Sequence, residues 1–225
     1  MKKKQILITG ASGFLGQHVV PLLTKRCSLR TIGRGRAPFK GIPHTRADLS
    51  RAIPTEATKN IDAIVHLASN ASIAHSIENP ASHIEHNLSL TLNILEACRA
   101  TGAKPLIIYL STDRVYAKAR GAVTENSAIF PIEPYVASKM MNETALKAYA
   151  NQFEIPCIIL RASAFFGPFQ PRRGFISDVI QKMIEGKEIT VGPLKGVKNF
   201  TYAGNVADAI SLALFTDPAH YNRTY

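Results

Sequence analysis

The sequence predicts a doubly wound α/β fold, in which helices cover both faces of a parallel sheet. Apolar runs of strand length alternate with helical segments along most of the chain, which is typical of βαβ units. Several runs are apolar at consecutive positions, as expected of parallel strands covered on both faces. A length of 225 residues suits one such core with a small addition, so we expect a main domain over residues 1–160 and a smaller portion over residues 161–225.

The strands of the main domain are predicted from apolar runs that end at turn-forming residues. They cover residues 6–9, 28–33, 44–47, 61–68, 106–110 and 157–160. The helices are predicted from apolar residues at helical spacing and from the glycines that follow them. They are a first helix ending near residue 24 and helices over residues 87–100 and 134–152.

The pattern loosens in the last third of the chain. The elements expected there are a loop at residues 167–174, helices at 175–185 and 206–215, a short strand at 188–191 and the beginning of another strand at 220–225. No run in the sequence is long and apolar enough to span a bilayer.

A glycine-rich turn connects the first strand to the first helix. Gly10, Gly13 and Gly16 are three residues apart, so the backbone can take angles closed to other residues and bring its N–H groups close to a phosphate. The positive end of the helix dipole adds to such a site. The spacing differs from G-x-G-x-x-G, and the alternative is a βα turn that binds nothing.

The cysteines and the charge limit the function classes. Cys27, Cys98 and Cys157 are widely separated and lack metal-ligand spacing, so we expect buried thiols in a reducing, cytoplasmic compartment and no metal site. The formal net charge is +11, but the basic residues are mostly dispersed. An anionic small ligand explains this charge at least as well as a nucleic acid, and we expect no nucleic-acid partner.

Three residues form a candidate catalytic set. Tyr135 and Lys139 are four apart on one predicted helix and therefore share a face. A lysine ammonium beside a phenol favours the phenolate, so we expect Lys139 to lower the pKa of Tyr135. Thr112 follows a buried strand and can bond the same substrate oxygen, which predicts a carbonyl or alcohol site.

A series of short motifs runs along nearly the whole chain. They are Thr9-Gly10-Ala11-Ser12-Gly13-Phe14-Leu15-Gly16, Asp48-Leu49, His66-Leu67-Ala68, Ser111-Thr112-Asp113-Arg114-Val115-Tyr116, Tyr135-Val136-Ala137-Ser138-Lys139, and Arg161 with Gly167-Pro168. In their residues and their order, these motifs together resemble the extended short-chain dehydrogenases/reductases of the NAD-dependent epimerase/dehydratase family.

The resemblance implies a Rossmann-type dinucleotide domain and a role for each matching residue. It implies that Tyr135 is the general acid/base, that Lys139 orients the nicotinamide ribose and that Thr112 polarises the carbonyl. The cofactor-binding residues that it implies, besides Tyr135 and Lys139, are Gly10, Gly13, Phe14 and Gly16 around the pyrophosphate, Asp48 and Leu49 at the adenine, and Ala68 near the nicotinamide.

Other roles remain open for three of the matching polar residues. Asp48 can equally cap a following helix. His66 ends a buried strand and is more often a structural histidine than a catalyst. Asn87 can be a helix N-cap, although members of the family often keep an asparagine there.

The departures from the family pattern shape the functional prediction. Where NAD-binding members tend to have an acidic residue after the second strand, this chain has Arg34 and Arg36, which suit a 2′-phosphate and favour NADP. Arg114 stands where related dehydratases have a glutamate, which weakens the case for water elimination. Ala164 replaces an asparagine of the family, and Lys198-Asn199-Phe200-Thr201-Tyr202-Ala203-Gly204-Asn205 replaces its Arg-Asp-Phe-x-x-Val-Asp-Asp stretch. Two expected contacts to a nucleoside diphosphate are therefore weakened, and Lys198 remains as the expected phosphate partner.

We therefore expect an NAD(P)-dependent epimerase or reductase that acts on a nucleotide-activated sugar by hydride transfer. The alternatives are a carbonyl reductase for a non-nucleotide substrate and a non-catalytic NADP-binding regulator. The family often dimerises through its helices, so a homodimer is expected. Because similar proteins continue further, we also expect a truncated form with an incomplete sugar pocket, in which the apolar faces of residues 175–185 and 206–215 are short of partners.

Overall fold

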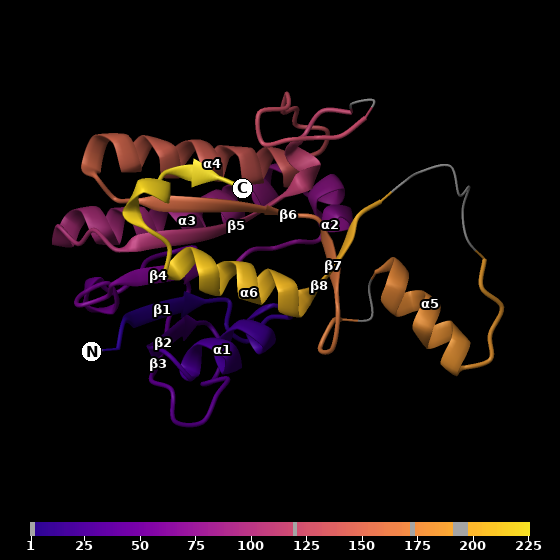
Figure 1. Ribbon diagram of the computed structural model, residues 1–225, viewed down its shortest axis with the longest axis horizontal. Coiled ribbons are helices and arrows are strands. Elements are labelled where there is room, and N and C mark those ends of the chain that lie inside the picture. The colour runs from indigo at the N-terminus through magenta and orange to yellow at the C-terminus, as the bar shows by residue number, and fades with distance from the viewer. Residues whose placement is uncertain (1–2, 119–120, 172–173, 191–197) are drawn as a thin grey trace.

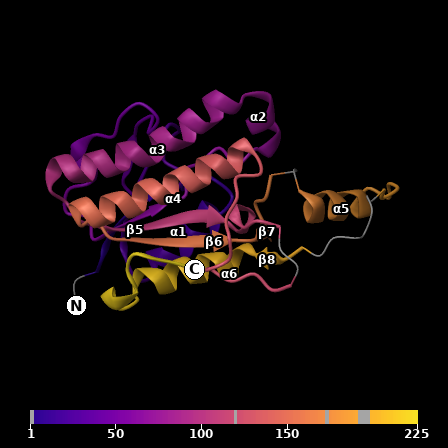
Figure 2. The same cartoon turned by 90° about the horizontal axis from the view of Figure 1, so that it is seen from above.

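The computed structural model describes residues 3–118, 121–171, 174–190 and 198–225. Within them, a seven-stranded sheet has the order β3-β2-β1-β4-β5-β6-β9, and every neighbouring pair is parallel. Helices lie on both faces of this sheet, which gives three layers (Figures 1 and 2). This confirms the predicted Rossmann-type doubly wound fold.

The elements follow the alternation expected from the sequence. The strands of the main sheet are β1 (Gln5–Thr9), β2 (Ser28–Gly33), β3 (His44–Arg46), β4 (Ala63–His66), β5 (Leu106–Thr112), β6 (Cys157–Ala162) and β9 (Arg223–Thr224). The helices are α1 (Gly16–Thr24), α2 (Ile73–Glu78), α3 (Pro80–Thr101), α4 (Pro134–Phe153), α5 (Phe175–Ile184) and α6 (Ala203–Leu214). A second, two-stranded sheet pairs β7 (Ala164–Phe166) with β8 (Phe200–Tyr202).

The two faces of β1 explain why its sequence is apolar at consecutive positions. Ile6 and Ile8 pack in the core beneath α1 and α6, whereas Leu7 packs in the core beneath α3 and α4. Side chains alternate between the faces of a strand, so a strand covered on both faces needs apolar residues throughout. All three side chains are at most 1% exposed.

Helix α6 corrects the expectation that residues 206–215 lack partners. Val206, Ile210 and Leu214 are buried in the same core as Val19 of α1. Lys4 Nζ donates a hydrogen bond to the Leu214 carbonyl oxygen at the end of this helix. Since β9 also joins the main sheet, residues 203–224 pack with the layers formed by residues 1–160, and the boundary at residue 160 stays a prediction.

Some predicted elements differ from the observed ones. Helix α3 begins at Pro80, seven residues before the predicted start at Asn87, and α2 precedes it. Residues 188–190 are not in a strand, and Val191 lies outside the described residues. The sequence interpretation also missed β7 and β8, because each has three residues and neither carries a long apolar run.

Helix α5 stands apart from the three layers (Figure 2). None of its described side chains is buried, and Ile180, Met183 and Ile184 are more than half exposed. Phe175 stacks on Phe200 with ring centroids 6.1 Å apart, which links the start of α5 to β8.

Candidate functional site

A cleft of about 910 Å³ opens at the carboxyl ends of β1 to β4. Ligands of doubly wound sheets bind at this edge because the strand ends and the helix N-termini meet there. Seven of the predicted cofactor-binding residues line the cleft: Gly10, Gly13, Arg34, Arg36, Asp48, Leu49 and Ala68. The structure therefore brings together residues that are up to 58 positions apart in the sequence.

The glycine turn approaches the loop after β4 closely. Gly10 has a φ of +69°, and a Cβ at this position would lie 2.7 Å from the main-chain nitrogen of Ala68. At Gly16, a Cβ would collide with the Ala11 carbonyl group, so this glycine lets α1 pack against the turn. Gly10 and Gly16 therefore have the turn and packing roles expected from their spacing.

Phe14 and Gly16 are not among the described residues that line the cleft. The ring of Phe14 stacks on Phe165 of β7 with centroids 5.4 Å apart, and it meets the ring of His18 edge to face at 5.6 Å. Phe14 thus connects α1 to the small sheet in this structure, and its cofactor contact remains a prediction.

The arginine pair and Asp48 lie on one wall of the cleft. Arg34 and Arg36 are exposed. The Asp48 carboxylate accepts hydrogen bonds from the main-chain N–H and the hydroxyl group of Ser50, which lower the pKa of this carboxyl. These contacts form a turn, and the next helical segment begins only at Thr55, so the helix-capping alternative is wrong, whereas Asp48 does line the cleft.

His66 is a structural histidine, as its buried position suggested. The Thr9 hydroxyl accepts a hydrogen bond from the Ala68 N–H and lies 2.8 Å from His66 Nδ1, while the Thr91 hydroxyl lies 3.1 Å from Nε2. Both ring nitrogens therefore have partners. Burial lowers the pKa of His66 to about 3, and the nearby Lys139 charge adds to this effect, so the ring is neutral near neutral pH.

Asn87 is a buried residue in the middle of α3 and not a helix N-cap. Its Oδ1 atom accepts a hydrogen bond from the Asn70 N–H at 2.8 Å. Its Nδ2 atom lies 3.0 Å from the Asn70 carbonyl oxygen and 3.1 Å from Ser138 Oγ on α4. Asn87 therefore fixes the loop that follows β4 to both α3 and α4.

Thr112 and Tyr135 meet at the end of β5. A hydrogen bond with the Thr112 side chain and the Arg114 charge both act to lower the pKa of Tyr135, but burial outweighs them and raises it to about 12. The expected lowering of this pKa by Lys139 is therefore wrong for this structure. Neither Thr112 nor Tyr135 is among the described residues that line the 910 Å³ cleft.

Lys139 is buried and lies one turn after Tyr135 on α4. Its Nζ atom donates a hydrogen bond to the Leu110 carbonyl oxygen at 2.8 Å, and it lies 4.9 Å from the ring centroid of Tyr109 but 6.0 Å from that of Tyr135. Burial lowers the pKa of Lys139 to about 8, and the Glu143 charge opposes this shift.

Arg114 stands where the family resemblance implies a glutamate in related dehydratases. Its guanidinium donates two hydrogen bonds of 2.9 Å to the carboxylate of Glu133, the residue before α4. Asp113 lies beside it, and burial raises the pKa of this carboxyl. The ion pair therefore joins the end of β5 to the start of the helix that carries Tyr135.

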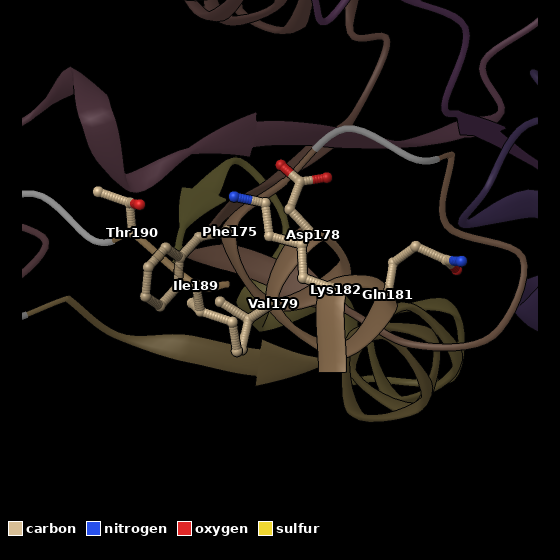
Figure 3. A pocket seen from close by; sticks show the side chains of 7 residues that line it. All are labelled: Phe175, Asp178, Val179, Gln181, Lys182, Ile189 and Thr190. Atoms are coloured by element: carbon tan, nitrogen blue, oxygen red, sulfur yellow. The ribbon is translucent and has the colours of Figure 1, made fainter. Parts of the chain in front are cut away.

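A second hollow, of about 350 Å³, lies on α5 and the residues that follow this helix (Figure 3). Phe175, Val179 and Ile189 form its apolar part, and Lys182 and Asp178 its charged part. None of the predicted site residues lines this hollow in the part of the chain that the structure describes.

Two further findings concern membranes and metals. No described helix is both long and apolar enough to cross a membrane. Among the residues placed by the structure, no group of three or more His, Cys, Asp or Glu side chains is arranged to hold a metal ion.

The chain matches the NAD dependent epimerase/dehydratase family over residues 6–223 and belongs to this family of enzymes. It is 31% identical over 225 residues to a putative UDP-glucose 4-epimerase of Methanocaldococcus jannaschii, covering 93% of this chain and 73% of that protein. It is 29% identical to a trifunctional UDP-glucose 4,6-dehydratase/UDP-4-keto-6-deoxy-D-glucose 3,5-epimerase/UDP-4-keto-L-rhamnose-reductase of Arabidopsis thaliana, covering 95% of this chain but only 35% of that protein.

A solved structure confirms the likeness of the fold. The UDP-glucuronic acid 4-epimerase of Bacillus cereus, in complex with UDP-glucuronic acid and NAD, superposes with a TM-score of 0.88 at 27% identity. The alignment covers 98% of this chain and 76% of that one. The chain therefore spans about three quarters of this relative.

Proposed function

We propose that the protein is an NAD(P)-dependent epimerase or reductase that acts on a nucleotide-activated sugar. The observation that carries this proposal is that Thr112, at the end of β5, lies next to Tyr135 of α4. The ends of neighbouring strands in the same parallel sheet form the glycine-lined cleft. The related epimerases that bind or are named for UDP-sugars support the substrate class.

The cleft residues fit a dinucleotide. Because a Cβ at Gly10 would meet the Ala68 main chain, a glycine is needed for the turn to lie against the loop after β4, and residues of both segments line the cleft. The N–H groups of this turn are the proposed pyrophosphate donors. Lys139 Nζ has one hydrogen-bond acceptor, the Leu110 carbonyl oxygen, among the described residues, which leaves donors for a ribose hydroxyl. Gly13, Asp48, Leu49 and Ala68 complete the proposed cofactor site.

Arg34 and Arg36 support a preference for NADP within this site. Both side chains are exposed on the cleft wall at the end of β2, where they can pair with a 2′-phosphate. The solved relative in complex with NAD shows that the family also uses the unphosphorylated cofactor. The preference is therefore a property proposed for this chain and is tested below.

The proposed mechanism divides the work among three side chains. Thr112 donates a hydrogen bond to the reacting sugar oxygen, and Tyr135 exchanges a proton with that oxygen at its phenolic group. The raised pKa of Tyr135, about 12, keeps the phenol protonated near neutral pH, which suits the delivery of a proton to a carbonyl oxygen. A bound nicotinamide supplies the hydride acceptor and donor for the neighbouring carbon.

A carbonyl reductase for a non-nucleotide substrate is the second candidate. It is favoured by Ala164, which lacks the amide of the family's usual asparagine, because this change weakens the expected diphosphate contacts. Lys198, the remaining phosphate partner, is exposed. Dehydration is less favoured, since Arg114 occupies the position of the second acid and is held by Glu133. A homodimer and a cytoplasmic location are further parts of the proposal that rest on the sequence.

Identification of the cofactor and a substrate assay test this function. The purified protein is denatured, and the released dinucleotide is identified by chromatography and absorbance. The intact protein is then incubated with UDP-glucose or UDP-glucuronic acid, and the sugar is followed by NMR. A retained dinucleotide with a change at C4 supports an epimerase, whereas an empty site with turnover of added NADPH supports a reductase. A protein that binds no dinucleotide and changes neither sugar would overturn the proposal.

A further inference from the structure

His75 and His83 form a hydrogen-bonded pair between the cleft and Tyr135. Their Nδ1 atoms are 3.2 Å apart. His83 is completely buried, and its ring meets the ring of Tyr135 edge to face with centroids 6.2 Å apart. His75, on α2, lines the cleft. Two Nδ1 atoms at this distance share one proton, so one ring donates and the other accepts.

The surroundings of His83 show which of its nitrogens carries the proton. Asn87 Oδ1 accepts from the Asn70 N–H, a group that can only donate, and this contact fixes the orientation of the Asn87 amide. The Nδ2 donor of Asn87 therefore faces His83 Nε2 at 3.0 Å. Asn87 Nδ2 has only two hydrogens for three neighbours, the Asn70 carbonyl oxygen, Ser138 Oγ and His83 Nε2, but it cannot accept a hydrogen bond. A proton on His83 Nε2 would therefore point at a donor, so the proton of the neutral ring is on Nδ1. Burial is the main cause that lowers the pKa of His83, and it favours the neutral ring.

The surroundings of His75 lead to the complementary result. Asn70 Oδ1 accepts from the Ser72 N–H, so the Asn70 Nδ2 donor faces His75 Nδ1 at 3.3 Å. His75 Nδ1 thus receives hydrogen bonds from both Asn70 and His83. A proton on this atom would point at two donors, so the neutral ring carries its proton on Nε2. Within the described ranges, His75 Nε2 has no hydrogen-bond partner.

We infer that His75 is a ligand-binding residue, which presents a fixed Nε2–H donor to a phosphate oxygen of the molecule in the cleft. This inference rests on the proposed function. An N–H group can only donate, and phosphate oxygens are strong acceptors that carry charge. The Arg34 and Arg36 side chains on the cleft wall favour an anionic ligand as well. The phosphate belongs either to the dinucleotide or to the nucleotide sugar, and the two sources are separable by experiment.

Two substitutions separate ligand binding from a structural role. The Oδ1 atom of His75→Asn stands near the position of Nδ1, so this variant keeps an acceptor for His83 but loses the donor at the cleft. The Nε2 atom of His75→Gln stands near the position of the imidazole Nε2, so this variant keeps the donor but loses the acceptor. Thermal unfolding of both variants reports the structural cost of each change.

Isothermal titration with NADP⁺, NAD⁺ and UDP-glucose, each alone, measures the effect. We expect His75→Asn to bind one class of ligand about tenfold more weakly than the parent, and His75→Gln to bind it within about twofold. The affected ligand identifies the source of the phosphate. Nitrogen-15 NMR of the unliganded parent should show the proton on Nε2 of His75 and on Nδ1 of His83.

The opposite results would overturn this inference without touching the proposed function. The first is that His75→Asn binds the ligands like the parent, the second that both variants weaken binding equally, and the third that neutral His75 carries its proton on Nδ1. Each result counts against the inference when the parent itself binds the ligands. A parent that binds neither a dinucleotide nor UDP-glucose would instead overturn the proposed function, and this inference with it.

Discussion

Glu143 and Arg161 form an ion pair in the interior of the protein, and their side chains are only 3% and 4% exposed. Arg161 Nη2 donates to Glu143 Oε2 at 2.6 Å, and the Ser111 hydroxyl donates to Oε1 of the same carboxylate. Glu143 follows Lys139 by one helical turn, while Ser111 follows Leu110, whose carbonyl oxygen holds Lys139. The pair therefore joins α4, β5 and β6 next to the proposed catalytic residues.

The first prediction concerns this pair. Glu143→Gln leaves the Arg161 guanidinium buried without a countercharge, so it should reduce the free energy of unfolding by about 3–5 kcal/mol. Glu56→Gln is the matched control, because Glu56 pairs with Lys59 at the surface and should change stability by at most about 1 kcal/mol. Urea unfolding measures both, and equal effects of the two variants would show that the buried pair has no special role.

The second prediction concerns pH. The pKa of His66 is about 3 in the folded protein and near 6.5 in the unfolded chain. Between these values the unfolded chain binds more protons, so stability falls as the pH falls, by at most about 1.4 kcal/mol per pH unit from this group. Urea midpoints of the parent and of His66→Gln should therefore converge from pH 7 to pH 4.5. Parallel pH profiles would contradict the buried, neutral state of His66.

The third prediction concerns the cofactor. If Arg34 and Arg36 bind a 2′-phosphate, the parent should bind NADPH more tightly than NADH. Changing both arginines to alanine should remove this preference. Each charged hydrogen bond that is lost should weaken the binding of NADPH by about 10-fold to 150-fold. Arg30→Ala is the control, since Arg30 contacts the Lys59 carbonyl oxygen and does not line the cleft. Equal affinities of the parent for NADPH and NADH would refute the preference.

The fourth prediction concerns Lys139. Lys139→Met removes the hydrogen bond to the Leu110 carbonyl oxygen and the donors proposed for the ribose, so it should weaken dinucleotide binding and turnover together. Lys147→Met is the control on the same helix, at an exposed position. Dinucleotide affinity measured by fluorescence titration checks this, and a parent-like affinity would remove Lys139 from the cofactor site.

The strands and the edge at which the site lies could be predicted from the sequence, because both depend on local patterns. An apolar run such as that around Ile64 indicates a buried strand by itself, and parallel strands bring Gly10, Asp48 and Thr112 to one edge of the sheet. The family motifs added roles to these positions that the pattern alone does not contain.

The remaining features depend on contacts between distant segments. The pattern of residues 206–215 gives no sign that they pack on Val19, and Phe14 matches a cofactor motif although Phe165 covers its ring. The pKa of Tyr135 could not be predicted either, because it depends on how deeply the ring is buried. The His75–His83 pair is set by the orientation of the Asn87 amide, which the loop after β4 determines.

The most direct test of the proposed function is the turnover of Tyr135→Phe compared with that of Tyr149→Phe, a control on the same helix. UDP-glucose or UDP-glucuronic acid is followed by NMR under conditions in which the parent is active, and dinucleotide binding is measured alongside. We expect Tyr135→Phe to bind the dinucleotide like the parent but to lose turnover by at least about 100-fold, because the ring remains and the transferable proton is gone. Parent-like turnover by Tyr135→Phe would contradict the assignment of Tyr135 as the general acid/base.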